Sequence, residues 1–300
     1  MDKYNLLDAV LAGLMRRYQE RVPDVGAIME AMKRYGIISN EDEIENDHIA
    51  FRSLGVPHLG IASMEKIFFR LGYERRDYYF FPEKKLHAYW YAPPAPVYPR
   101  IFLSELWVGG MSGRVQRILG SYTGHLQADP VEALDLDDAA AIDHFLHSSS
   151  WGLPTLSDYE ALAEESEYAA WAIYNRYYLN HFTISVHGLP AGYNTVADFN
   201  RFLESEGIKL NDAGGKIKTS PDGGLLQSST VARMVRAEFA GGETKEIPGS
   251  YVEFAERRVL PEYAHLTAAE VRREHRREGF EAGNADKIFE STYRSQVDRG

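Results

Sequence analysis

In the segment N-D-H-I-A-F-R-S, residues 46–53, an apolar run at residues 49–51 is flanked by polar residues, among them His48 and Arg52. Successive side chains of an extended chain point to opposite faces, so His48, Ala50 and Arg52 share one face and the intervening apolar side chains share the other. The pattern predicts a β-strand with an imidazole and a guanidinium on one face. A core histidine with satisfied hydrogen bonds beside an arginine that reaches solvent is one interpretation, and a functional pair is the other.

Helical periodicity precedes this strand and follows it. Apolar residues recur at helical spacing over residues 3–35, with a break at Pro23 and Gly26, which predicts two N-terminal helices. After the strand, Ser63 is a plausible N-cap and Gly72 a stop signal for a further helix. Three strand-like segments follow, R-R-D-Y-Y-F-F, L-H-A-Y-W-Y and P-R-I-F-L-S-E-L-W-V.

The same order of elements recurs in the second half of the chain. N-H-F-T-I-S-V predicts a strand from His181 to His187, and T-V-A-D-F-N-R-F-L-E-S-E-G predicts the helix after it. Further strand-like segments are I-K-L-N, G-G-L-L-Q-S-S-T-V-A, R-M-V-R-A-E-F and G-S-Y-V-E-F-A-E-R-R-V. Both halves therefore begin with a strand headed by a histidine, His48 or His181, which indicates an internal repeat.

The repeat predicts an α+β fold built from paired β-α-β-β-β modules in one compact catalytic domain. The expected divisions are N-terminal helices at 1–40, a first module at 41–110, a helical insert at 111–178, a second module at 179–262 and C-terminal helices at 263–300. The insert is acidic and is interpreted as a cover. The tail is expected to form a pair of charged helices on the outside of the domain.

Composition limits the partners and the compartment. The chain has 300 residues, 44% of them hydrophobic, and a net charge of -11, so neither a nucleic acid nor an anionic membrane is an expected partner. It contains no cysteine, which excludes disulfides, thiolate ligands and a cysteine nucleophile. The N-terminal segment does not resemble a signal peptide, and no apolar stretch is long enough to span a membrane. We therefore expect a cytoplasmic protein, of an oligomeric state that the sequence does not indicate.

His48 and His181 occupy corresponding positions of the two modules, so packing of the modules as a pair would bring the imidazoles face to face. A carboxylate within an apolar strand is costly to bury unless it is paired or bound to a metal. Glu253, between Val252 and Phe254, is such a carboxylate. Two imidazoles and one carboxylate form the facial triad of non-haem Fe(II) oxygenases. Unrelated core residues are the alternative interpretation.

Other candidate residues have simpler interpretations. Glu256 is an alternative carboxylate, but its charged neighbourhood favours exposure to solvent. His187 shares the strand face of His181 and is expected at the surface, at the end of the strand. The segment H-S-S-S-W-G lacks the Gly-x-Ser-x-Gly elbow of a serine nucleophile, and the glycine pairs of the chain do not form a phosphate-binding motif.

Three segments, D-H-I-A-F-R, N-H-F-T and Y-V-E-F-A-E-R, resemble the metal-binding segments of the 2-oxoadipate dioxygenase/decarboxylase family. These enzymes, also called 2-hydroxyglutarate synthases, form a branch of the vicinal-oxygen-chelate superfamily. The resemblance covers most of residues 46–260. It implies a curved, half-open barrel around an Fe(II) ion bound by His48, His181 and Glu253. It also implies conversion of a 2-oxo dicarboxylic acid, 2-oxoadipate, and O2 into 2-hydroxyglutarate and CO2.

The resemblance further implies that Arg52 holds a substrate carboxylate. A guanidinium binds a carboxylate bidentately, and four residues along a strand place it roughly 13 Å from His48. Arg257, on the last strand of the second module, is a weaker candidate for which a surface ion pair is expected. G-G-L-L-Q-S-S-T also resembles a family segment, which would place Gln227 and Ser229 near the substrate pocket.

Two other functions remain compatible with these residues. One is a non-catalytic protein of the same fold that binds a small molecule or a metal, and the other is a metalloenzyme that uses a non-redox ion. The combination of three candidate ligands with Arg52 favours the oxygenase.

Overall fold

The computed structural model describes residues 3–148 and 150–298 of the chain. Within these residues the helices are α1 Lys3–Arg21, α2 Pro23–Arg34, α3 Ile61–Arg70, α4 Gly113–Thr123, α5 Ala139–His147, α6 Leu156–Glu165, α7 Glu167–Asn175, α8 Val196–Ser205, α9 Ala282–Ile288 and α10 Arg294–Val297. The strands are β1 Asn46–Leu54, β2 Glu74–Phe81, β3 Leu86–Ala92, β4 Arg100–Leu106, β5 His181–Ser185, β6 Lys218–Thr219, β7 Leu225–Ser229, β8 Met234–Glu238, β9 Thr244–Pro248 and β10 Tyr251–Arg257.

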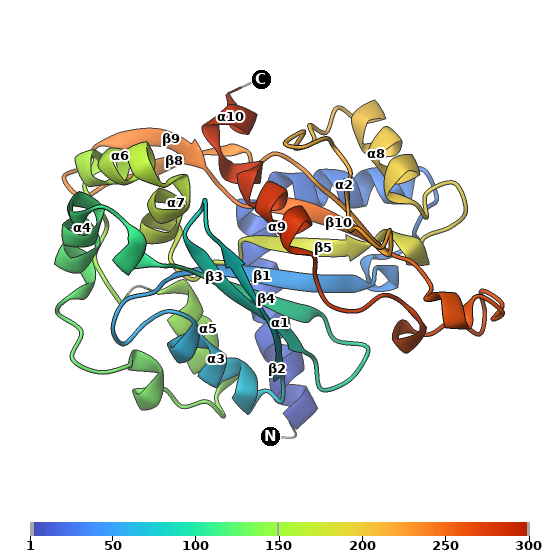
Figure 1. Ribbon diagram of the computed structural model, residues 1–300, viewed down its shortest axis with the longest axis horizontal. Helices are drawn as coiled ribbons and strands as arrows, with labels where there is room; N and C mark the ends of the chain where they lie inside the picture. The colour runs from blue at the N-terminus through green and yellow to red at the C-terminus, as the bar shows by residue number, and fades with distance from the viewer. Residues whose placement is uncertain (1–2, 149, 299–300) are drawn as a thin grey trace.

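In the described part of the chain, eight strands form one sheet in the order β2-β3-β4-β1-β5-β10-β7-β6. In the first half β1 lies parallel to β4, and in the second half β5 lies parallel to β10. The halves meet where β1 pairs antiparallel with β5, so they are related by a pseudo-two-fold axis at the centre of the sheet (Figure 1). The predicted α+β fold of paired β-α-β-β-β modules is confirmed.

Two predicted strands of the second module differ from the structure. I-K-L-N makes only an isolated bridge, between Leu210 and Thr230, and the edge of the sheet is β6 instead. R-M-V-R-A-E-F forms β8, which pairs with β9 in a separate two-stranded sheet. Phe239, directly after β8, packs on Tyr159 of α6, with ring centroids 5.3 Å apart. The hairpin therefore buries its apolar side chain against the helical insert.

The two faces of the main sheet are covered differently. Phe51 of β1 packs on Phe68 of α3, and Phe254 of β10 packs on Phe199 of α8. Since neighbouring residues of a strand point to opposite faces, His48 and Arg52 of β1 point away from these helices. We call the face of the sheet that points away from α3 and α8 the inner face. Figure 1 shows α9, drawn in red, in front of the strands at the centre of the sheet.

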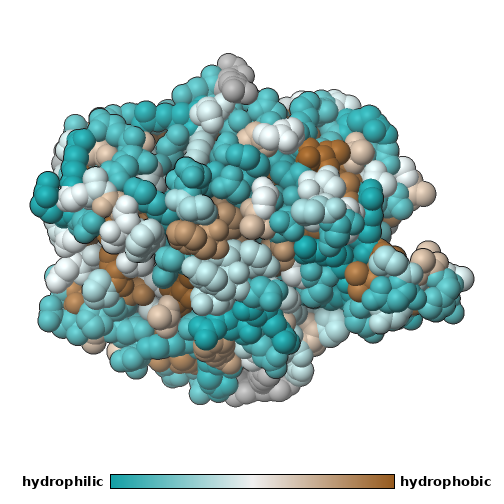
Figure 2. Space-filling model, viewed as in Figure 1, coloured by the Kyte–Doolittle hydropathy of each residue, from teal (hydrophilic) through white to brown (hydrophobic). Residues whose placement is uncertain are grey.

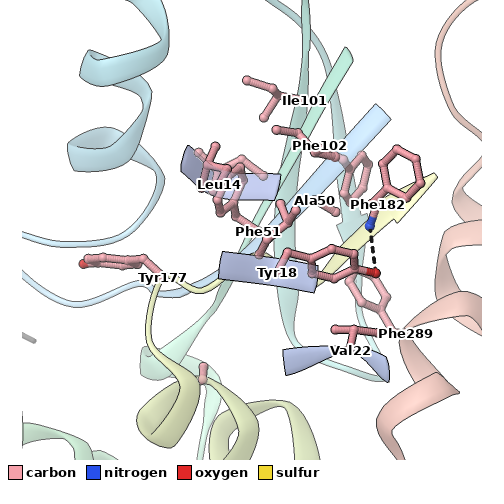
Figure 3. Packing of buried hydrophobic residues seen from close by; sticks show 14 of the residues in the cluster. Leu14, Tyr18, Val22, Ala50, Phe51, Ile101, Phe102, Tyr177, Phe182 and Phe289 are labelled. Atoms are coloured by element: carbon pink, nitrogen blue, oxygen red, sulfur yellow. Dashed lines mark hydrogen bonds between the residues drawn. The ribbon is translucent and has the colours of Figure 1, made fainter. Parts of the chain in front are cut away.

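Tyr18 of α1 connects β5 and β10 from the side of the N-terminal helices. Its hydroxyl accepts a hydrogen bond from the backbone N–H of Phe182 at 3.3 Å (Figure 3). The same hydroxyl donates to the backbone carbonyl of Tyr251. Because a buried polar group costs free energy unless it is hydrogen-bonded, these two bonds favour one position of the strand ends relative to α1.

The residues after β10 contradict the prediction that the tail packs on the outside. Phe280, Ile288 and Phe289 are buried, and they line the space between α9 and the inner face of the sheet. The tail is rich in charged residues, and its few apolar residues follow no helical period, so the sequence pattern did not identify them as core. We call residues 277–293 the C-terminal segment.

The surface of the molecule is described by the hydropathy of its residues (Figure 2). The face that carries the C-terminal segment is mostly hydrophilic, and its hydrophobic residues form separate patches (Figure 2). Among the described residues there is no helix that is both long enough and apolar enough to cross a bilayer.

Gly60 offers a test of the loop that leads into α3. Its φ is 80°, and an added Cβ would overlap the carboxylate of Glu105, which accepts a hydrogen bond from the N–H of Ile61 at 2.7 Å. We expect Gly60→Ala to lower the free energy of unfolding by about 1–3 kcal/mol, because it strains the backbone and displaces this acceptor. Urea denaturation measures the change.

Gly120→Ala is the matched control. Gly120 lies inside α4, is exposed, and has nothing within 4 Å of an added Cβ. Alanine is the better helix former by about 0.5–1 kcal/mol, so this variant should be slightly more stable than the wild type. Equal changes in the free energy of unfolding for the two variants would contradict our account of Gly60.

Candidate metal centre

Three side chains from three strands meet at the middle of the inner face. His48 lies on β1, His181 begins β5, and Glu253 lies on β10. The two Nε2 atoms are 3.3 Å apart, and the Glu253 oxygens lie 3.1 Å from Nε2 of His181 and 3.5 Å from Nε2 of His48. One donor atom from each residue lies within 4.8 Å of the others, and all three residues are buried. This spacing allows a single ion to contact all three.

The register of the strands explains why these residues meet. Ala50 pairs with His181 across the junction of β1 and β5, and His48 is the preceding residue on the same face of β1. Glu253 lies two residues beyond the partner of His181 on β10. At the corresponding position of the first module, two residues beyond the partner of His48 on β4, stands Phe102. Only the second module therefore supplies a carboxylate.

Each imidazole is oriented by the residue that precedes it in the sequence. Nδ1 of His48 lies 2.8 Å from an oxygen of Asp47, and Nδ1 of His181 lies 3.1 Å from the side-chain oxygen of Asn180. Since both Nδ1 atoms face acceptors, we assign their hydrogens there, which leaves each Nε2 lone pair directed at the centre. The dipeptides D-H and N-H were the signal in the sequence for these two contacts.

Burial and charge act differently on the two histidines. Burial alone lowers the pKa of His48, but the carboxylates of Glu253 and Asp47 outweigh it and raise the pKa above its usual value. Burial lowers the pKa of His181 well below its usual value, and the neighbouring His48 and Arg52 side chains lower it further. Two imidazole nitrogens with one carboxylate oxygen are a donor set that suits divalent first-row metals.

A cluster of buried charges lies behind His48. Arg257 donates from Nε and Nη2 to the two carboxylate oxygens of Asp47 at 2.6 and 2.9 Å, and Arg100 donates to the same carboxylate at 3.3 Å. Burial by itself raises the pKa of Asp47, but the two guanidinium groups and His48 hold it well below its usual value. Arg100 also pairs with Glu278, so the cluster reaches the C-terminal segment.

Three predictions about residues beside the centre are wrong. Arg257 is 1% exposed and does not form a surface ion pair. Glu256, expected in solvent, is buried and accepts a hydrogen bond from the N–H of Val196 at the start of α8 at 2.9 Å. His187 lies in a 3-10 turn, is half-buried, and accepts a hydrogen bond from the backbone N–H of Arg257. Both faces of β10 are covered, and the alternation of residue types could not indicate this.

Arg52 lies on the inner face of the sheet and is 1% exposed. It lines a cavity that His48, His181 and Glu253 also line. Its Nη1 donates to the hydroxyl of Thr292 at 2.9 Å and its Nη2 to the carbonyl of Phe289 at 3.0 Å. The guanidinium also lies 5.0 Å from the ring of Tyr168 and 5.1 Å from that of Trp171, both in α7. Among the described residues no carboxylate forms an ion pair with Arg52, which is therefore a buried cation with neutral partners.

Gln227 and Ser229 lie on β7, next to β10. Gln227 lines the cavity, donates to Glu253 at 2.6 Å and accepts from Asn284 at 3.0 Å. The hydroxyl of Ser229 is fully buried and lies 2.9 Å from that of Ser291. Gln227 thus contacts a candidate ligand, whereas Ser229 contacts the C-terminal segment.

The C-terminal segment closes the cavity in front of the centre. The ring of Phe280 packs edge-on against His48 with centroids 4.8 Å apart, and Ala285, Ile288 and Phe289 line the cavity beside it. The space left free is about 20 Å³, room for about one water molecule. Sequence reasoning missed these lining residues because they are isolated in a charged tail.

Comparison with known proteins agrees with this geometry. The model of the 2-oxoadipate dioxygenase/decarboxylase family matches residues 10–269. The chain belongs to this family. It is 44% identical over 303 aligned residues, 97% of this chain and 78% of the relative, to the chloroplastic 2-oxoadipate dioxygenase/decarboxylase of Arabidopsis thaliana. It is 43% identical to the chloroplastic/amyloplastic enzyme of that name from Oryza sativa subsp. japonica, with 97% of this chain and 79% of the relative aligned.

A solved structure is similar over nearly its whole length. The hydroxyglutarate synthase from Oryza sativa, crystallised in complex with 2-oxoadipate, superposes with a TM-score of 0.88 at 42% identity. The match covers 98% of this chain and 94% of the rice chain.

The two plant relatives also correct the expected compartment. Both are chloroplastic proteins, one of them also amyloplastic, so the expectation of a cytoplasmic protein is wrong. That expectation rested on composition and on the character of the N-terminal segment. The residues of a folded domain are selected for folding and chemistry, and they do not specify the compartment.

Arg257→Gln tests the buried charge cluster. The variant leaves the carboxylate of Asp47 with a single guanidinium partner, and breaking a buried ion pair typically costs about 3–5 kcal/mol. We expect a loss of this size in the free energy of unfolding, measured by urea denaturation. The control is Arg114→Gln, which breaks an exposed pair with Glu164 and should cost less than about 1 kcal/mol. Similar losses in the two variants would contradict the role of Arg257.

Proposed function

We propose that this chain is an Fe(II)-dependent dioxygenase/decarboxylase that converts 2-oxoadipate and O2 into 2-hydroxyglutarate and CO2. The observation that carries the proposal is the buried convergence of His48, His181 and Glu253 beside a buried arginine, Arg52, that has no counter-ion in the described part of the chain. Membership of the family and the likeness to the rice synthase, whose structure contains 2-oxoadipate, support the choice of substrate.

The donor set favours iron as the metal. Two neutral imidazole nitrogens and one carboxylate oxygen on one face of the ion are the ligands of non-haem Fe(II) oxygenases. His48, His181 and Glu253 would hold the ion, and Asp47 and Asn180 would keep the two Nε2 atoms directed at it. Bound Fe(II) would supply the redox chemistry with O2 and a binding position for the 2-oxo acid.

The charges of the cavity match a dicarboxylic acid. A divalent ion with Glu253 leaves one positive charge at the centre, and Arg52 provides a second positive charge further along the inner face. Two carboxylates on one substrate would neutralise both. We assign Arg52 to the carboxylate remote from the 2-oxo group, because a guanidinium pairs with carboxylate oxygens through parallel N–H donors.

Aromatic side chains would keep water away from the bound substrate. Phe102, Phe280 and Phe289 line the same cavity as the candidate ligands and Arg52. Exclusion of water strengthens the electrostatic contacts of the substrate and limits side reactions. Gln227, which donates to Glu253 and accepts from Asn284, would hold the carboxylate in one orientation.

The direct test is turnover by the purified protein loaded with Fe(II). We expect O2 consumption, CO2 release and 2-hydroxyglutarate formation in equal amounts when 2-oxoadipate is added, because the proposed reaction uses one O2 per substrate. An oxygen electrode and chromatography of the product measure them. Loading with Zn(II) is the control and should abolish turnover. Activity with Zn(II) would indicate a non-redox metalloenzyme, and binding of 2-oxoadipate to the Fe(II) protein without O2 consumption would indicate a binding protein.

Two substitutions separate metal binding from substrate binding. His181→Ala removes one of the candidate ligands and should abolish retention of iron after gel filtration. Arg52→Ala should retain iron but lower kcat/KM for 2-oxoadipate by about 100-fold or more, since an ion pair with a buried carboxylate is lost. Iron content by atomic absorption and steady-state kinetics check both outcomes. Equal loss of iron in the two variants would contradict the assigned roles.

A further inference from the structure

Within residues 3–148 and 150–298, three polar atoms in the cavity wall have no hydrogen-bond partner. They are Nε of Arg52, the hydroxyl of Tyr251 and the side-chain nitrogen of Asn180, and each belongs to a buried residue. Leaving a buried polar group unsatisfied costs about 1–3 kcal/mol. All three groups can donate a hydrogen, so together they favour a ligand that presents acceptor oxygens.

Tyr251 is placed to contact such a ligand beyond the metal centre. It begins β10, two residues before Glu253 and on the same face, and its ring lies 4.8 Å from that of His181. Its hydroxyl lies close to Arg52 and Ser291, but no described residue has full hydrogen-bond geometry with it. A phenol keeps its proton at neutral pH, so the hydroxyl can donate a hydrogen bond.

Arg52 by itself offers an incomplete site for a carboxylate. Each Nη atom already donates one hydrogen, to Thr292 or to Phe289, and Nε is the one guanidinium nitrogen that has no partner among the described residues. A carboxylate has two oxygens and room for about four hydrogen bonds. A second donor near Arg52 would therefore complete the pairing, and among the described lining residues the hydroxyl of Tyr251 is the unpaired group influenced by that guanidinium.

We propose that Tyr251 determines specificity for dicarboxylic 2-oxo acids: its hydroxyl donates a hydrogen bond to the same remote carboxylate that Arg52 binds. This inference rests on the proposed function and adds a residue to it. A monocarboxylic 2-oxo acid of equal length would leave both the Tyr251 hydroxyl and Arg52 Nε unpaired, so the site would discriminate against it.

The test compares binding of 2-oxoadipate and of 2-oxohexanoate, which has the same length but lacks the remote carboxylate. Titration calorimetry on the Fe(II)-loaded protein without O2 gives both dissociation constants. Tyr251→Phe should weaken the binding of 2-oxoadipate by about 10- to 100-fold, the range for a hydrogen bond to a charged group. It should change the dissociation constant of 2-oxohexanoate by less than about 3-fold. In kinetics the KM for 2-oxoadipate should rise while kcat changes little.

Tyr177→Phe is the matched control. The hydroxyl of Tyr177 is also buried and without a partner, but Tyr177 is not among the residues that line the cavity. This variant should leave both affinities unchanged. Neither substitution removes a hydrogen bond that the tyrosine side chain makes, so both variants should fold and retain iron, which melting curves and iron content check on the same preparations.

Two results would overturn the role of Tyr251. One is an equal loss of affinity for both ligands in Tyr251→Phe, which would mean that the ring acts on the metal centre through His181. The other is unchanged affinity for 2-oxoadipate in that variant. The proposed function fails by a different result, the absence of O2 consumption by the wild type, and binding without O2 still tests Tyr251 in that case.

Discussion

One buried carboxylate, that of Asp47, holds together the parts that make the candidate metal centre. It orients His48 of the first module, accepts two hydrogen bonds from Arg257 of the second module, and accepts another from Arg100. Arg100 extends the contact to Glu278 in the C-terminal segment. Buried charges are stable only when they are paired and hydrogen-bonded, so the cluster tolerates very few arrangements of its members. The cluster thereby fixes the positions of both modules and of the C-terminal segment relative to the imidazole of His48.

The C-terminal segment is coupled to the site through its other end as well. Arg52, the candidate partner of a substrate carboxylate, donates to Thr292 and to the carbonyl of Phe289 in that segment. Helix α7 of the insert contributes the aromatic rings of Tyr168 and Trp171 beside the same guanidinium. Arg52, which would bind the substrate, therefore also holds the C-terminal segment in place. The cavity in this conformation has about 20 Å³ of free space, which is less than a six-carbon acid occupies.

Several features were predictable because they depend on short-range pattern. The two-residue period of an extended chain placed His48 and Arg52 on one face of the strand, and the recurrence of a histidine at the head of a second strand indicated the paired modules. The isolated carboxylate of Glu253 in an apolar strand also stood out. The errors share one physical cause. Whether Arg257 and Glu256 are buried depended on which distant element covers β10. The apolar residues of the tail follow no helical or strand period, so the sequence pattern could not distinguish core from surface there.

The sequence by itself determined the α+β modules, the residue types available as ligands and the dipeptides that orient the two imidazoles, because these follow from backbone periodicity and from neighbours in the chain. Tertiary structure decided the rest. Strand register brought His48, His181 and Glu253 to one point, and the fold of the tail turned Arg52 and Tyr251 into buried groups facing a closed cavity. Burial and the pairing of charges depend on contacts between residues far apart in the chain, and the local sequence pattern does not show which of these residues come into contact.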